Sequence, residues 1–226
     1  MKNHYAVEVS LLAFEEKRRN LVKRLERTGY IESKKVKRAF LRVPRHLFVP
    51  EHMKDRAYMD SPQPIGEGQT ISAPHMVAMM VEKVELEDGH KVLEVGGGLG
   101  YHAAVMAEIV GEEGEIYSVE RLPSLAESAK DILKRTPYDN VHIITGDGSS
   151  GYEEEAPYDR ISVACGSPDL PEPLIQQLKV DGKLLIPVGG KMFQSLVKVT
   201  KTSKTSIKKK NLGGVLFVPL KGKYGY

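Results

Sequence analysis

The residues of this chain with the clearest chemical potential are glycines that follow a short apolar run. Within residues 91–107, KVLEVGGGLGYHAAVMA, the run stops at Gly96, and Gly98 and Gly100 follow before apolar residues resume at helical spacing. A strand, a glycine turn and a helix in this order make a glycine pattern informative. Glycine has no Cβ, so the chain can turn sharply and a ligand can contact its backbone. The pattern predicts a nucleoside-type cofactor.

A carboxylate at a fixed distance from the glycines supports this prediction. Glu120 ends the next apolar run, residues 115–119, and lies 20 residues after Gly100. Nucleotide-binding α/β domains have at this place the carboxylate that accepts hydrogen bonds from ribose hydroxyls. A purely structural glycine turn is the alternative, but the agreement of strand, helix and acid favours a ligand site.

The spacing of the glycines bears on the type of cofactor. It is G-x-G-x-G, whereas dinucleotide folds have G-x-G-x-x-G, and the last glycine of that pattern would fall on Tyr101. Glu94, two residues before the first glycine, suits a cationic ligand better than a diphosphate. The run E-V-G-G-G-L-G resembles motif I of class I S-adenosylmethionine-dependent methyltransferases.

A second candidate site precedes the glycines. Residues 45–74 carry prolines and glycines that break every periodic pattern, which predicts a long ordered loop, and such loops in compact domains are usually functional. Pro74 is placed as the first residue of a helix over residues 74–84, so Ser72 lies just before the N-terminus. Free N–H groups at that point could hold a carboxylate or a phosphate. Alternatively, Ser72 and Thr70 only cap the helix.

Three stretches resemble the protein-L-isoaspartate O-methyltransferase family: RVPRHLFVPE at 42–51, MDSPQPIG at 59–66 and QTISAPHM at 69–76. GGVLFVPL at 213–220 is similar to its C-terminal strand, but Lys221 stands where the family often has threonine. The resemblance implies transfer of a methyl group from S-adenosylmethionine to the free carboxylate of L-isoaspartyl residues, which initiates protein repair through a succinimide.

The resemblance also implies roles for individual residues. Ser72 would be the active-site residue, and Ser72, His75 and Val218 would bind substrate. S-adenosylmethionine, leaving as S-adenosylhomocysteine and without a metal, would be held by Gln69, Thr70, Ile71, Glu94, Gly96, Gly98, Gly100, Glu120, Arg121, Asp147 and Gly148. For the last two, a plain Asp-Gly turn is the alternative. A substrate carboxylate is already ionised at neutral pH, so the reaction needs no general base, and no catalytic dyad is evident.

The alternation of strand and helix from residue 91 to 188 predicts an α/β fold with a doubly wound, mostly parallel, seven-stranded sheet of the class I methyltransferase type. The expected strands are 92–95, 115–119, 141–145, 158–164, 183–188, 193–199 and 213–220. We expect one domain over residues 1–226, composed of an N-terminal helical extension (1–58), an active-site loop and helix (59–90), a cofactor-binding core (91–190) and a C-terminal hairpin (191–226). Ser33 should cap the second helix.

Composition limits the class of protein. The net charge of +3 does not by itself indicate nucleic acid, the single Cys165 fits a reducing compartment, and the seven histidines show no metal-ligand spacing. We therefore expect a cytoplasmic protein without a nucleic-acid or membrane partner. We expect a monomer because no exposed apolar helix is evident, and the resemblance implies isoaspartyl proteins as its partners. The lysines at 201–210 are expected at a solvated hairpin tip, a nucleic-acid finger being the alternative. Residues 164–168, ACGSP, lack the (Asn/Asp)-Pro-Pro-aromatic motif of amino-directed nucleic-acid methyltransferases.

Overall fold

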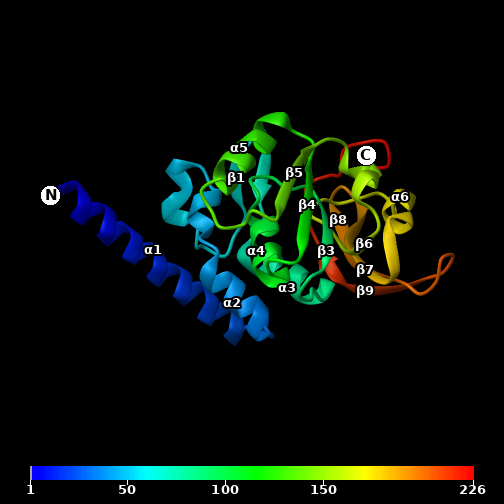
Figure 1. Cartoon of the computed structure of the whole chain (residues 1–226), viewed down its shortest axis with the longest axis horizontal. Coiled ribbons are helices and arrows are strands. Elements are labelled where there is room, and N and C mark those ends of the chain that lie inside the picture. Colours follow the sequence, from blue (N-terminus) through cyan, green and yellow to red (C-terminus); the bar gives the residue numbers. More distant parts are fainter. Residues whose placement is uncertain (1) are drawn as a thin grey trace.

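The computed structural model describes residues 2–226 and, within the first helix, the side chains from Leu12 onward. Its centre is a seven-stranded sheet in the order β5-β4-β3-β6-β7-β8-β9 (Figure 1). The first five strands in this order are parallel, and β8 and β9 add an antiparallel end. The strands are β3 (Lys91–Val95), β4 (Glu115–Glu120), β5 (Val141–Thr145), β6 (Tyr158–Val163), β7 (Leu178–Gly190), β8 (Phe193–Lys201) and β9 (Ile207–Val215). The predicted fold class is confirmed.

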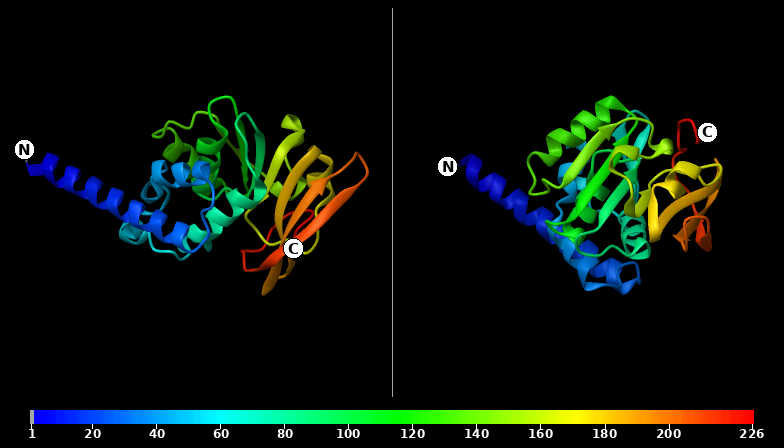
Figure 2. Two further views of the ribbon diagram at one scale, coloured as in Figure 1. Left: turned by 90° about the horizontal axis from the view of Figure 1, so that it is seen from below. Right: turned by 45° about the vertical axis from the view of Figure 1, so that its right-hand side comes forward.

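Both faces of the sheet are buried, as parallel strands require. Along β3, Val92 packs in the core on the side of the larger helices, while Leu93 and Val95 pack with residues of β6 and β7. The helices are α1 (Lys2–Arg27), α2 (Lys34–Arg42), α3 (Pro74–Val84), α4 (Tyr101–Val110), α5 (Pro123–Leu133) and α6 (Glu172–Gln176). The long α1 and the β7–β9 strands lie at opposite ends of the molecule in both views of Figure 2.

The order of the strands fixes where a ligand can bind. From β3 the chain runs outward to β4 and β5 and then returns to β6, which pairs with the other edge of β3. The connections that follow β3 and β6 therefore leave in opposite directions, and a crevice opens at the carboxyl ends of these two strands. The glycine loop follows β3 at this point.

Several local predictions are confirmed. Ser33 caps α2, because its hydroxyl accepts a hydrogen bond from the backbone N–H of Val36, and Pro74 is the first residue of α3. Residues 45–74, however, are more regular than expected. They contain two 3-10 helices, η1 (Arg45–Phe48) and η2 (Glu51–Arg56), and a hairpin of β1 (Gln63–Gly66) and β2 (Gln69–Ile71). Elements this short carry too few residues to show a period in the sequence.

The C-terminal strands differ from the prediction. The last strand is Ile207–Val215 and not 213–220, so Lys208, Lys209 and Lys210 lie within β9 and not at a hairpin tip. Strand β9 is the edge of the sheet, where lysines discourage pairing with another chain. Strand β7 also begins earlier than expected, at Leu178, and continues through Gly182 with a bulge in its pairing to β6.

Burial of His46 gives the fold a dependence on pH. Its ring stacks on Phe14, with centroids 4.3 Å apart, and Nδ1 lies 2.8 Å from the Tyr58 hydroxyl. Burial, assisted by the charges of Arg18 and Lys54, lowers the pKa of His46 from 6.5 to about 4. The unfolded chain therefore binds more protons between these values, so this contribution to stability is complete above pH 6.5 and is lost as pH falls toward 4.

We expect the free energy of unfolding to fall by about 1 to 3 kcal/mol more in the wild type than in His46→Phe between pH 7 and pH 4.5. Phenylalanine keeps an aromatic ring against Phe14 but cannot take up a proton. Urea denaturation at a series of pH values measures the difference. Parallel pH profiles for the two proteins would exclude His46 as the titrating group.

Candidate functional site

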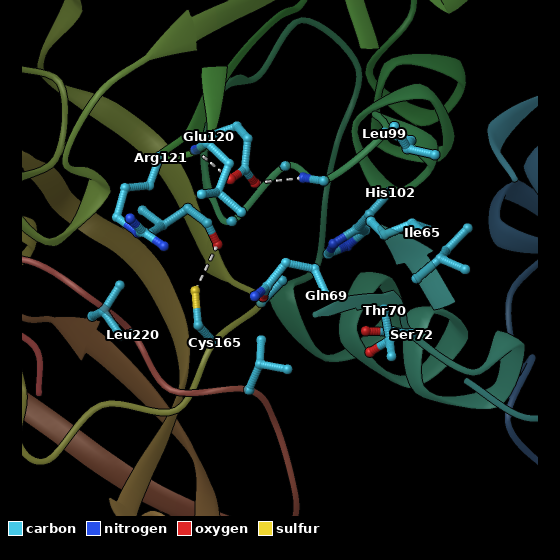
Figure 3. Close-up of a pocket in the computed structure, with 18 of the residues that line it drawn as sticks. Ile65, Gln69, Thr70, Ser72, Leu99, His102, Glu120, Arg121, Cys165 and Leu220 are labelled. Atoms are coloured by element: carbon cyan, nitrogen blue, oxygen red, sulfur yellow. Dashed lines mark hydrogen bonds between the residues drawn. The ribbon is translucent and has the colours of Figure 1, made fainter. Parts of the chain in front are cut away.

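A cavity lies at the carboxyl ends of β3, β4 and β6, where the strand order predicts a crevice (Figure 3). Its walls come from the β1–β2 hairpin, the start of α3, the glycine loop, the end of β4 and the segment after β9. The lining residues that were expected in the site are Gln69, Thr70, Ile71, Ser72, Gly96, Gly98, Glu120, Arg121 and Val218. Residues from segments about 150 positions apart thus share one cavity.

Glu120 organises the glycine loop. Its Oε2 accepts a hydrogen bond from the Gly98 N–H at 2.8 Å, and its Oε1 accepts one from the Leu122 N–H at 2.9 Å. Only 7% of the residue is exposed, yet it lines the cavity. Each carboxylate oxygen has a second lone pair, so Glu120 can still accept hydrogen bonds from two hydroxyls of a ligand.

The glycines bring the loop close to the ends of the strands. A Cβ on Gly97 would lie 2.2 Å from Ser118 Oγ, and one on Gly96 would lie 2.8 Å from Cys165 Sγ. Larger residues would push the loop away from β4 and β6. Gly100 does not line the cavity; it precedes α4 with a φ of 89° and faces Leu133.

Ser72 lies between β2 and α3 and is half-buried. The residue that precedes α3 is Ala73, and no side chain of the described residues caps this helix from that position. Asp60 instead accepts the His75 N–H at 2.9 Å, and the same oxygen lies 2.9 Å from His75 Nδ1. Ser72 is thus not a helix cap and lines the cavity, whereas His75 faces Asp60 and is not among the lining residues.

The buried Arg45 fixes the backbone at Ser72. Its Nη2 donates to the Ser72 carbonyl and its Nε to the Ala57 carbonyl, both at 2.8 Å, and the guanidinium lies 4.8 Å from the centre of the Tyr101 ring. Burial lowers the pKa of Arg45 below its usual value. The Arg45 side chain therefore connects Ala57, the turn at Ser72 and Tyr101, which follows the glycine loop.

Three further expected residues lie around the cavity but do not line it. Asp147 Oδ1 accepts from the Ser149 N–H at 2.9 Å, and Oδ2 accepts from the Lys223 N–H at 2.8 Å. Burial would raise the pKa of Asp147, but these hydrogen bonds outweigh it and lower the pKa. Gly148 packs against Val95, and Glu94 is fully buried beneath the glycine loop.

Sequence reasoning missed several lining residues, among them His102, Leu99 and Leu220. The sequence did carry a signal for His102, because it is the second residue of the helix that follows the glycine loop. Lys221 also lines the cavity, although its contribution was uncertain from the sequence. Burial, together with the charges of Glu120 and Glu94, raises the pKa of Cys165 to about 12, so its thiol stays protonated.

The arrangement can hold a nucleoside by its sugar hydroxyls at Glu120 and place the rest of the ligand beside Ser72. Within residues 2–226, no group of three or more histidine, cysteine or acidic residues is arranged to hold a metal ion. Nor does the described part of the chain contain a helix long and apolar enough to span a bilayer.

A family model and known relatives of this chain indicate the same family. A family model described as protein-L-isoaspartate(D-aspartate) O-methyltransferase matches residues 16–225. Protein-L-isoaspartate O-methyltransferase 2 of Archaeoglobus fulgidus is 56% identical over 94% of this chain and 96% of its own length. The corresponding enzyme of Methanothermobacter thermautotrophicus is also 56% identical, over 93% of this chain and 98% of its own length.

Two solved structures of methyltransferases of this kind are also similar to the chain. A crystal structure of a beta-aspartate methyltransferase from Plasmodium falciparum in complex with S-adenosyl-L-homocysteine has a TM-score of 0.80 and 32% identity, covering 89% of this chain and 97% of that one. A second protein-L-isoaspartate O-methyltransferase structure has a TM-score of 0.84 and 33% identity, covering 92% of this chain and 67% of that one.

Proposed function

Because this chain belongs to the protein-L-isoaspartate(D-aspartate) O-methyltransferase family, we propose that the cavity at the glycine loop is its cofactor site, with Ser72 at the end where methyl transfer occurs. The enzyme transfers a methyl group from S-adenosylmethionine to the free carboxylate of L-isoaspartyl residues in damaged proteins and peptides, which initiates repair through a succinimide. The observation that carries the proposed site is the presence of Glu120 and Ser72 in one cavity.

The residues present fit such a cofactor. Glu120 offers free lone pairs to ribose hydroxyls, and the loop Gly96–Gly98 carries no side chains that would keep a ligand from its backbone. When bound, S-adenosylmethionine supplies an electrophilic methyl group on a sulfonium. No metal is needed for this reaction.

The task left to the protein is alignment of the two reactants. An isoaspartyl carboxylate has a pKa near about 4 and is ionised at neutral pH, so no side chain has to remove a proton from it. The Ser72 hydroxyl can hold the carboxylate in line. The first N–H groups of α3, which were expected to take part, are already engaged: Pro74 has no N–H, the His75 N–H donates to Asp60, and the Met76 N–H donates to the Ala73 carbonyl. Arg45 keeps this turn in place through the Ser72 carbonyl.

We also propose that the enzyme is a cytoplasmic monomer without a nucleic-acid or membrane partner. The single cysteine and the net charge of +3 support this proposal. Light scattering at several protein concentrations tests the oligomeric state.

The experiment that tests the function is methyl transfer from labelled S-adenosylmethionine to two peptides that differ only in L-isoaspartate or L-aspartate at one position. We expect base-labile methyl ester on the isoaspartyl peptide alone. No transfer to either peptide, with S-adenosylhomocysteine bound normally, would reject the substrate. Transfer to RNA or DNA instead would identify a nucleic-acid methyltransferase.

Replacing Ser72 with alanine should lower kcat by about tenfold to thirtyfold and leave the affinity for S-adenosylhomocysteine within about twofold, because one hydrogen bond to an ionised group is removed. Steady-state kinetics with the isoaspartyl peptide and calorimetric titration measure the two quantities. Ser72→Thr, which keeps a hydroxyl, should recover part of the rate. Ser206→Ala, at the exposed turn between β8 and β9, is the control. Equal turnover in Ser72→Ala and the wild type would remove Ser72 from the mechanism.

A further inference from the structure

His102 is a buried polar side chain in the cavity that the mechanism above does not use. It is the second residue of α4, only 8% of it is exposed, and it lines the cavity. Its Nε2 has no hydrogen-bond partner among the described residues. A buried nitrogen left without a partner costs free energy, so the site is complete only when a ligand atom meets it.

The other side of the ring faces a buried acid. His102 Nδ1 lies 3.1 Å from Glu94 Oε1, and the Ser118 hydroxyl donates to Glu94 Oε2 at 2.5 Å. Glu94 and Ser118 are fully buried. Glu94 Oε1 forms no hydrogen bond among the described residues, so the carboxylate faces Nδ1 as a neighbouring charge, and Nε2 is the ring nitrogen left for a ligand.

The position of His102 indicates which part of the cofactor it meets. In Figure 3 Glu120 and Arg121 lie at one end of the cavity, and His102 projects into it on the side of Thr70 and Ser72. If Glu120 holds the ribose, the adenosine end is fixed there, and the amino-acid end of the cofactor extends toward His102. This inference therefore rests on the proposed function.

The amino-acid end of the cofactor carries a carboxylate and an ammonium group, and the charges around His102 favour the carboxylate as its partner. To donate to a ligand carboxylate from Nε2 while Nδ1–H faces Glu94, the ring has to be an imidazolium, whose charge then partly neutralises both carboxylates. The N-terminus of α4 adds a partial positive charge at the same place. An ammonium group at Nε2 would bring a cation to the positive end of this helix.

We propose that His102 binds the carboxylate of the methionine part of the cofactor through Nε2–H, and that Glu94 is its positioning residue. The contact discriminates ligands that carry this carboxylate from those that lack it. No covalent step is involved.

The test compares two probes that differ only in this carboxylate, S-adenosylhomocysteine and S-adenosyl-3-thiopropylamine. Their affinities are measured by calorimetric titration for the wild type and for His102→Leu. In the wild type, loss of the carboxylate should weaken binding about tenfold to a hundredfold, the range of a charge-assisted hydrogen bond. In His102→Leu the two probes should bind equally well. Glu94→Gln should reduce the discrimination between them, and His142→Leu, on the surface at β5, should keep it.

The outcomes separate this inference from the proposed function. Failure of the wild type to bind S-adenosylhomocysteine would reject the cofactor site itself. Normal binding with the same discrimination in His102→Leu would reject the role of His102. A weaker affinity of His102→Leu for the isoaspartyl peptide, with cofactor discrimination unchanged, would assign the ring to the substrate carboxylate and overturn the proposal. Equal weakening of both probes in His102→Leu, with wild-type discrimination retained, would indicate a purely structural ring.

Discussion

Replacing Glu120 with alanine should weaken S-adenosylhomocysteine binding by about a hundredfold to a thousandfold. The change removes the acceptor proposed for the ribose hydroxyls, and hydrogen bonds to an ionised group contribute about 1.5 to 3 kcal/mol each. It also removes the acceptor of the Gly98 and Leu122 N–H groups, so the glycine loop loses its attachment to the end of β4. Titration with S-adenosylhomocysteine measures the loss directly.

The structure offers a matched control on the same strand. Glu115 begins β4 as Glu120 ends it, and its side chain lies at the surface, paired with His142. Glu115→Ala should bind the cofactor product as the wild type does. Retention of wild-type affinity by Glu120→Ala would mean that the ribose is held elsewhere and that the distance from Gly100 to Glu120 carries no functional information.

Arg45→Met should lower the free energy of unfolding by about 3 to 5 kcal/mol and lower kcat in the protein that remains folded. The guanidinium is fully buried, and its loss leaves the Ala57 and Ser72 carbonyls without their donors. Unpaired buried carbonyls cost about 1 to 3 kcal/mol each, and the contact with the Tyr101 ring is lost as well. Urea denaturation and peptide kinetics at a temperature where the variant is folded measure the two effects.

Lysine should not replace this arginine. Its single ammonium cannot reproduce the planar group that donates to two carbonyls in different directions. Arg45→Lys should therefore recover less than half of the free energy of unfolding that Arg45→Met loses. Arg56→Met, an exposed arginine in the same segment, should change stability by no more than about 0.5 kcal/mol. A wild-type kcat in folded Arg45→Met would show that the Ser72 turn holds its geometry without the guanidinium.

The class of fold and the centre of the site could be predicted from the sequence because their signals are local. Apolar runs of four to six residues, separated by helical periods, define parallel strands wherever both faces are covered. The glycines of residues 96–100 and the distance to Glu120 depend on one strand-turn-helix unit. The start of α3 at Pro74 and the capping of α2 by Ser33 depend on the immediate neighbours alone.

Other features depend on residues that are distant in the chain, and only the tertiary structure decided them. The contact of Arg45 with the Ser72 carbonyl spans 27 positions, and the contact of the Lys223 N–H with Asp147 spans 76. A sequence pattern cannot identify such pairs, because one member of each is a backbone atom that has no side-chain signature. The strand boundaries of β9 were missed for a similar reason, since an edge strand is defined by its pairing with β8 and tolerates lysine.

The sequence by itself determined the strand, glycine turn and helix that predict a nucleoside-type cofactor, because steric freedom and strand periodicity are properties of consecutive residues. The tertiary structure decided which neighbours complete the cavity. It turned His102 toward the cavity with Glu94 behind it, and His75 toward Asp60. Both histidines follow a loop at the start of a helix, and the direction of each ring depends on which carboxylate the packed fold brings within reach.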